Sequence, residues 1–126
     1  MSVRRIVPNL RLAEGDASEA MAGHRAFYGL LGLEEVMNHG WVMTLASPVE
    51  PAAQLSFLTH DATAPVVPDL SIEVADVDAA YEAVRASGAR IVHPLRDEEW
   101  GVRRFFVEAP DGRVVNVLGH HRPPTD

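Results

Sequence analysis

The chain opens twice with nearly the same six residues. The stretch VPNLRL at residues 7–12 recurs as VPDLSI at residues 67–72, sixty positions later in a chain of 126 residues. A chain of this length supports one compact core and is too short for two ordinary domains. The repeat therefore predicts two copies of one structural unit inside a single domain that spans residues 1–126.

A helical pattern follows the first copy of the repeat. Asp16, with Glu19 three residues later, is typical of a helix N-terminus, and Gly32 is well placed to end the helix. Between them, hydrophobic residues fall near one face of a helix: Ala17, Met21, Phe27, Tyr28 and Leu31. We therefore expect a helix over residues 17–31.

The second copy is followed by a helical pattern of the same kind. Either Asp76 or Asp78 can cap its start, and Gly88 can end it in a left-handed conformation. The apolar stripe consists of Val77, Tyr81 and Val84. This pattern predicts a helix over residues 77–87, which ends at the place that corresponds to the end of the first helix.

Short β-branched or aromatic segments separated by turn residues follow each helix, and Pro110-Asp111-Gly112 is a favourable hairpin turn between two of them. Each half therefore forms a βαβββ unit. We place the first module at about residues 4–60, a Pro-rich linker at 61–66, the second module at about 67–121 and a C-terminal tail at 122–126.

One four-stranded sheet with one helix leaves its second face uncovered, so two paired units would enclose a concave cavity. Side chains alternate between the two faces of a strand. In the first strand of the second unit, the helix side would receive Leu70, Ile72 and Val74. The cavity side would receive Asp69, Ser71 and Glu73. In the last strand, Val115 and Val117 would pack on the helix. The cavity side would receive Val114, Asn116 and Leu118, which predicts an apolar lining with isolated polar groups, as in many small-molecule sites.

The composition narrows the classes of partner and chemistry. The formal net charge is −7, and all eleven basic residues are Arg, which disfavours a nucleic-acid partner because such binding needs a cationic surface. The Arg-only, Ala-rich usage is typical of a GC-rich bacterial genome. The chain has no cysteine, which excludes disulfides, thiolate metal sites and cysteine nucleophiles.

The chain also lacks the signals of a membrane or exported protein. No apolar run approaches the roughly 20 residues that span a bilayer, and the charged start MSVRRIVPNLRL lacks the apolar core of a signal peptide. We therefore expect a cytoplasmic protein without a membrane partner.

The common catalytic motifs are absent from the sequence. It has no Gly-rich phosphate loop, no nucleophile elbow and no histidine-rich metal motif. Asp69 or Glu73 could act as an acid or base, because burial in an apolar cavity can raise the pKa of a carboxyl group. Nothing else in the sequence points to a reaction, and we assign no catalytic residue.

The paired modules, the segment FYGLLGLEEV after the first helix and the segment EEWGVRRFFVEAPDGRVVNVLGH near the end resemble the vicinal oxygen chelate superfamily. That superfamily contains glyoxalase I, bleomycin-resistance proteins, extradiol dioxygenases and fosfomycin-resistance enzymes. The resemblance covers roughly residues 4–121. It implies an α+β fold in which two βαβββ modules form a concave sheet barrel, a small-molecule ligand and a homodimer.

In metal-dependent members of that superfamily, the first and last strands of each module supply metal ligands, usually His, Glu or Gln. The corresponding residues here are Asn9, Gln54, Asp69 and Asn116, although the alignment would also allow Val7 in place of Asn9. Three neutral amides and one carboxylate are a weak set for a divalent ion. We therefore expect no metal and no other cofactor, and we assign these four residues to ligand binding.

Two tryptophans are further candidates for ligand contacts. The resemblance places Trp41 and Trp100 where substrates often meet loops and strand ends, and an indole offers a large apolar face with one donor. Trp41 could equally be an ordinary sheet residue.

The acidic residues 97–99 indicate a solvated loop, or would favour a cationic ligand if they lie at the rim of the cavity. Arg103 and Arg104 could pair with these acids or clamp an anionic substrate.

The histidines have plainer interpretations. We expect His24 at the edge of the core, and His39 and His60 in solvated positions. His93, which precedes a proline, lies in a segment that often borders the cavity in the superfamily, but a single histidine is more often bonded to backbone.

The leading hypothesis is therefore a protein like the glyoxalase and bleomycin-resistance members that binds or sequesters a small molecule, such as an antibiotic, without a metal. One alternative is a divalent-metal-dependent lyase, isomerase or dioxygenase of the same superfamily. Another is a ligand-sensing or partner-binding module that performs no reaction.

Overall fold

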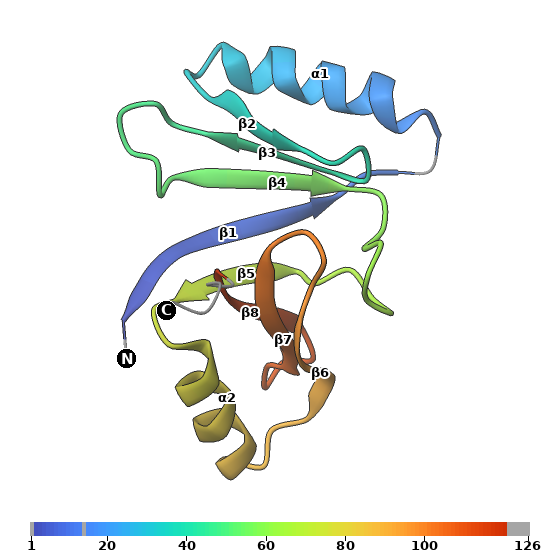
Figure 1. Cartoon of the computed structure of the whole chain (residues 1–126). Helices are drawn as coiled ribbons and strands as arrows, with labels where there is room; N and C mark the ends of the chain where they lie inside the picture. The colour runs from blue at the N-terminus through green and yellow to red at the C-terminus, as the bar shows by residue number, and fades with distance from the viewer. Residues whose placement is uncertain (1, 14, 121–126) are drawn as a thin grey trace.

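The computed structural model describes residues 2–13 and 15–120, so the predicted tail at 122–126 and the last residue of the predicted second module lie outside the described residues. Two helices and eight strands follow one another in the βαβββ order twice (Figure 1). The first series is β1 (Val3–Arg11), α1 (Ala17–Gly29), β2 (Glu34–Asn38), β3 (Val42–Ala46) and β4 (Gln54–Leu58). The second is β5 (Leu70–Val74), α2 (Val77–Ala86), β6 (Ile91–Asp97), β7 (Val102–Glu108) and β8 (Val114–His120).

The eight strands form one curved sheet in the order β2-β3-β4-β1-β5-β8-β7-β6. The first strands of the two modules, β1 and β5, pair antiparallel at the centre, and each pairs parallel with the last strand of its own module. Figure 1 shows α1 and α2 at opposite ends of the molecule, each beside the strands of its own module. The sheet is open, because its edge strands β2 and β6 do not pair with each other.

Helix α1 begins where the sequence predicts and ends two residues earlier. The Asp16 carboxylate accepts a hydrogen bond from Glu19 N at 3.2 Å, and Gly32 has the positive φ of 97° that a helix end favours. The predicted stripe is too wide, because Phe27 and Leu31 are exposed. Leu31 lies beyond the last helical residue, so the helical period no longer directs its side chain to the sheet.

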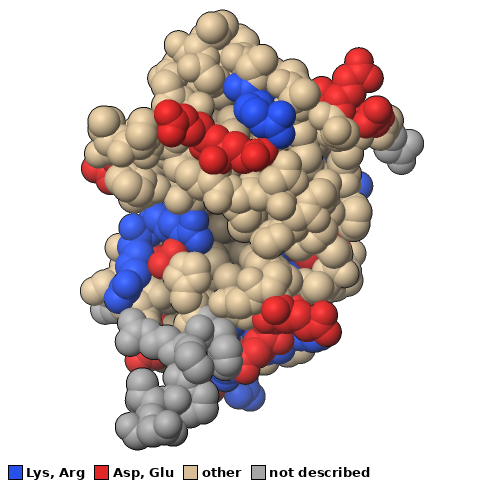
Figure 2. Space-filling view, turned by 45° about the horizontal axis from the view of Figure 1, so that its top comes forward, with Lys and Arg blue, Asp and Glu red and all other residues tan. Residues whose placement is uncertain are grey.

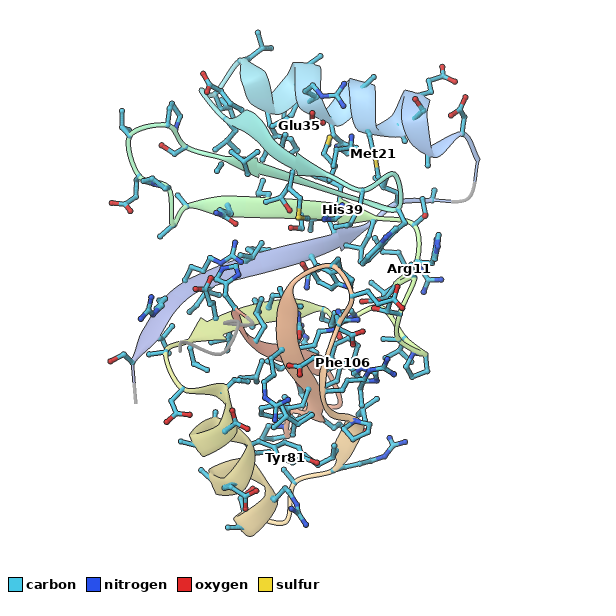
Figure 3. The ribbon with its side chains drawn as sticks, in the orientation of Figure 1. Arg11, Met21, Glu35, His39, Tyr81 and Phe106 are labelled. Carbon is cyan, nitrogen blue, oxygen red and sulfur yellow. The ribbon has the colours of Figure 1, made fainter. Side chains whose placement is uncertain are left out.

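The core of the first module lies between α1 and the sheet. Met21 is buried against Met43, Leu45 and Phe57, and it points toward the strands below α1 in Figure 3. The imidazole of His24 stacks on Phe57 with ring centroids 4.6 Å apart. This contact confirms the interpretation of His24 as a residue at the edge of the core.

The core of the second module is built in the same way. Asp76, rather than Asp78, caps α2 by accepting from Ala79 N at 3.0 Å, and Gly88 has a φ of 81°. Tyr81, labelled in Figure 3, packs edge-on against Phe105 with centroids 4.9 Å apart. The other apolar residues of this cluster confirm the predicted helix side of the strands: Ile72, Val74, Val115 and Val117. No helix in residues 2–13 and 15–120 is long and apolar enough to cross a membrane.

The strand registers refine the internal repeat. Asn9 on β1 lies beside Ser56 on β4, and Ser71 on β5 lies beside Asn116 on β8. Ser56 and Asn116 are sixty positions apart, whereas Asn9 and Ser71 are sixty-two apart. When the last strands are aligned at the offset of sixty, Asn9 therefore corresponds to Ser71 and not to Asp69, because Asn9 and Ser56 are two positions further apart than Ser71 and Asn116.

Candidate functional site: a polar cavity between the modules

The concave side of the sheet encloses a cavity of about 500 Å³. Residues from both modules line it, with β1, β4, β5 and β8 forming the floor. Figure 2 shows the surface hollowed between an upper and a lower half, with arginine side chains beside the recess. A volume of this size is in the range of small-molecule sites.

Uncharged polar side chains meet at the floor of the cavity. Asn9 Nδ2 and Asn116 Nδ2 both donate to Ser71 Oγ, at 2.8 and 3.0 Å. On the neighbouring strands, Thr44 Oγ1 and Ser56 Oγ share a hydrogen bond of 2.8 Å. Asn116 is only 4% exposed, and its Oδ1 has no hydrogen-bond partner among the described residues. The floor therefore presents a buried acceptor that the protein itself does not satisfy.

A charged pair lies next to this floor. The Arg5 guanidinium donates from Nε to Glu73 Oε1 and from Nη1 to Gln54 Oε1. Gln54 in turn donates to the backbone carbonyl of Pro51 at 2.8 Å, and His120 Nε2 lies 3.5 Å from Glu73 Oε1. Because Arg5 already neutralises Glu73, this carboxylate is held as an ion-pair partner.

The two tryptophans meet over the cavity. Trp41 comes from the segment before β3 and Trp100 from the segment before β7, and their rings contact edge to face with centroids 5.7 Å apart. The indole Nε1 of Trp100 donates to Thr63 Oγ1 at 3.1 Å, which fixes the ring. Both side chains line the cavity and supply its flat apolar surface.

Arg104 is buried behind Trp100. Its Nη1 and Nη2 atoms donate to the two carboxylate oxygens of Asp61, each at 2.8 Å, and its Nε donates to Glu98 at 3.1 Å. Its guanidinium also lies 5.0 Å from the centre of the Trp100 ring and 4.8 Å from that of Phe106. The sequence left open whether Arg104 pairs with acidic residues or binds an anionic substrate. The structure favours pairing with acidic residues.

Glu98 is not part of a solvated loop, as the sequence suggested for residues 97–99. Its side chain is buried, and Oε1 lies 2.9 Å from His93 Nε2. Burial acts to raise the pKa of this carboxyl group, but hydrogen bonds from His93 and Arg104 and the charge of Arg104 outweigh it, so the pKa lies below its usual value. The prediction failed because Glu98 is buried by tertiary contacts. His93 on β6 and Arg104 on β7 both bond its carboxylate, and these contacts form only in the folded sheet.

Arg103 lies on the other side of the same strand and points away from the cavity. Its guanidinium binds Asp78 on α2 at 2.8 Å and Asp97 at 3.2 Å. These hydrogen bonds, above all the one to Asp78, raise the pKa of Arg103. Arg103 therefore holds α2 to the sheet and does not contribute to the cavity.

Five of the six side chains assigned to ligand binding line the cavity: Asn9, Trp41, Gln54, Trp100 and Asn116. The sixth, Asp69, is exposed at the start of β5 and is not among the lining residues. Its Oδ2 accepts a hydrogen bond from Val114 N at 2.8 Å. Asp69 therefore helps to hold the start of β5 beside the start of β8.

The sequence profile of the Glyoxalase/Bleomycin resistance protein/Dioxygenase superfamily matches residues 25–117, which is most of the chain. The chain belongs to this superfamily. The match runs from the last part of α1 into β8, and it confirms the fold expected from the resemblance.

Solved structures show the same superfamily fold. A superfamily member from Vibrio splendidus 12B01 is 17% identical, with 94% of this chain and 99% of that chain covered and a TM-score of 0.63. Methylmalonyl-CoA epimerase from Mycobacterium tuberculosis is 19% identical, with 95% and 88% covered and a TM-score of 0.60. The NAD-dependent benzaldehyde dehydrogenase from Legionella pneumophila is 15% identical, with 92% and 99% covered and a TM-score of 0.68. No curated protein matches the chain.

The residues that the resemblance assigns to metal positions do not form a good site for a divalent ion. Gln54 Oε1 already accepts from the Arg5 guanidinium, whose positive charge opposes a nearby cation, and the Asp69 carboxylate is bonded to backbone. Asn9 and Asn116 use their amide nitrogens to bond Ser71, so they could offer a cation only neutral carbonyl oxygens. The described residues also contain no group of three or more His, Asp or Glu side chains arranged to hold a metal.

The cavity is more polar than strand alternation predicts. The sequence pointed to an apolar lining, but Arg5, Asp61 and Arg104 also line it. The position of Arg104 could have been predicted from the sequence. Strand alternation places it with Val102 and Phe106 on the face of β7 that lies opposite the helix. The position of Asp61 could not have been predicted, because it depends on how the linker folds over β7.

Proposed function

We propose that this superfamily member binds or sequesters a small molecule in the cavity between its modules, without a metal and without a chemical step. The observation that carries the proposal is that each Arg, Asp and Glu side chain among the described lining residues has an oppositely charged partner, Arg5 with Glu73 and Arg104 with Asp61. Each of these carboxylates is held by its arginine partner and is not directed at a ligand as a free charged group. What remains is an apolar and hydrogen-bonding surface, which suits binding.

The direct test is an untargeted search for small molecules that co-purify with the protein. We would denature the untagged protein after native purification and compare the released compounds by mass spectrometry with those from an unrelated protein from the same host. An enriched compound that raises the melting temperature on re-addition would support the proposal. Conversion of that compound into a product by the native protein would contradict it.

The metal-dependent alternative makes a different prediction. A lyase, isomerase or dioxygenase of this superfamily would bind a divalent ion in near-stoichiometric amount and would lose turnover with a chelator. Elemental analysis of protein purified without a chelator or affinity tag tests this point. A ligand-sensing module would instead change its oligomeric state or partner when the compound binds.

We further infer that the protein forms a homodimer. Three apolar side chains near the end of α1 support this inference: Phe27 is 58% exposed, Leu30 is 84% exposed and Leu31 is 72% exposed. Exposed apolar patches often mark interfaces. Light scattering coupled to gel filtration should give the mass of two chains, and Leu30→Glu should shift it toward one chain. A native mass of one chain would contradict the inference.

A further inference from the structure

The side chain of Asn116 provides the most informative polar atom in the cavity. It lines the cavity, it is 4% exposed, and Oδ1 has no hydrogen-bond partner among the described residues. Its Nδ2 donates to Ser71 Oγ at 3.0 Å, and in this arrangement Oδ1 is the amide atom without a partner. A buried acceptor without a partner is costly to keep, so a ligand that donates to it gains affinity.

Ser71, the neighbour of Asn116 across β5 and β8, completes the site. Its Oγ accepts from the amide nitrogens of Asn9 and Asn116, so both of its acceptor positions are used. A hydroxyl group also carries one hydrogen, and the described residues supply no acceptor for it. The floor therefore offers one acceptor, Asn116 Oδ1, beside one donor, the Ser71 hydroxyl.

Taking the proposed function as its basis, we propose that the cavity recognises a neutral ligand with a carboxamide-like group, in which an N–H donor adjoins a carbonyl acceptor. The ligand N–H donates to Asn116 Oδ1, and its carbonyl oxygen accepts from the Ser71 hydroxyl. An aromatic or other flat apolar body attached to this group packs against Trp41 and Trp100, which line the same cavity.

The charges in the cavity favour a neutral ligand. Arg5 is bonded to Glu73 and Arg104 to Asp61, so neither an anionic nor a cationic ligand meets an unpaired counter-charge among these lining residues. Burying an unpaired charge is far more costly than burying a hydrogen-bonded neutral group. The amide and hydroxyl floor satisfies such a neutral group without any charge.

The test uses three matched probes, each titrated with the native protein and followed by fluorine NMR. They are para-fluorobenzamide, its N,N-dimethyl derivative and methyl para-fluorobenzoate, of which only the first has an N–H group. We expect para-fluorobenzamide to bind about five- to tenfold more tightly than the other two, the scale of one well-formed hydrogen bond. Asn116→Leu should abolish this preference, and Asn116→Asp, which keeps an acceptor oxygen, should retain it.

Asn38→Leu is the matched control, because it makes the same substitution at an exposed residue that is not among the cavity-lining residues and whose side chain bonds Glu35 and Gly40. It should leave the preference ratio unchanged. Equal affinities for the three probes, tighter binding of the dimethylamide or no binding of any probe would overturn this inference. The search for co-purifying compounds judges the proposed function separately, so the two can fail independently.

Discussion

Arg104 on β7 and Asp61 in the linker between the modules form a two-pronged ion pair inside the protein, with both N–O distances at 2.8 Å. Both side chains are 2% exposed. The pair ties the linker to the strand that carries one wall of the cavity. Because Trp100 lies over the same guanidinium and donates to Thr63 in the linker, the wall, the linker and the tryptophan form one buried unit.

The first prediction concerns the stability that depends on this pair. Arg104→Met should lower the free energy of unfolding by about 3–5 kcal/mol, because it leaves the carboxylates of Asp61 and Glu98 buried without their shared cation. Urea denaturation followed by tryptophan fluorescence measures the change. Arg90→Met is the control, since Arg90 pairs with Glu108 at the surface and should contribute less than about 1 kcal/mol. Equal effects of the two substitutions would contradict the prediction.

The second prediction is a pH dependence that originates at Glu98. Its pKa is lowered from the usual 4.5 in the folded protein. A lowered pKa means that the ionised carboxylate stabilises the fold above pH 4.5 and that this contribution is lost as the pH falls through the folded-state pKa. Glu98→Gln should therefore reduce stability at neutral pH and flatten its decline below pH 4.5. The measurement is the melting temperature as a function of pH.

Glu35→Gln provides a comparison for this titration. The pKa of Glu35 is also lowered, by hydrogen bonds from Asn38 and Arg25, but these groups lie at the surface. Solvent weakens such exposed interactions, so this substitution should change the pH profile less. A larger change for Glu35→Gln than for Glu98→Gln would place the main acid-sensitive group outside the buried network.

Local patterns in the sequence predicted the fold well. Asp16 and Asp76 cap the two helices, and Ile72 and Val117 pack on α2 as the alternation of their strands requires. These features depend on neighbours within a few residues, so they can be read from the sequence. Phe27 was placed near the apolar face of the first helix but is exposed, because a helical stripe does not say how wide the contact with the sheet will be.

The site was harder to predict, because it depends on which strands meet. The internal repeat matched Asn9 with Asp69, but when the last strands are aligned at the offset of sixty, the residue that matches Asn9 is Ser71. Burial of Glu98 likewise requires Arg104 from β7 and His93 from β6, which lie together only after the sheet forms. Such convergence has no periodic signature in a single sequence.

The third prediction concerns Trp100 as part of the ligand-binding wall. Trp100→Ala should weaken binding of the co-purifying compound by about 1–3 kcal/mol, the scale of a lost buried aromatic contact. Trp100→Phe keeps the apolar face but removes the hydrogen bond to Thr63 and should lose less affinity. Isothermal titration calorimetry on the three proteins gives the comparison. An unchanged affinity in Trp100→Ala would show that the ligand does not touch this residue.

The fourth prediction separates ligand binding without a metal from metal-dependent catalysis. Thermal melts of the untagged protein should not change when a chelator is added, nor when Mn, Fe, Co, Ni or Zn ions are added at stoichiometric concentration. The physical reason is that Asp69 is the only carboxylate of the four superfamily positions, and its Oδ2 is bonded to Val114 N, while Gln54 faces the Arg5 guanidinium. A tightly bound ion would stabilise the folded protein in proportion to the logarithm of its concentration.

Two variants make this last prediction specific. Asp69→Ala should cost about 1 kcal/mol of stability, because it removes one hydrogen bond between β5 and β8, and that cost should be the same with and without metal ions. Arg5→Met should remove the positive charge beside Gln54 and leave Glu73 without its arginine partner. Any metal affinity that can be created at this site should therefore be highest in that variant. A native protein that is stabilised by one of these ions, with the stabilisation lost in Asp69→Ala, would contradict the prediction and favour a metal-dependent enzyme.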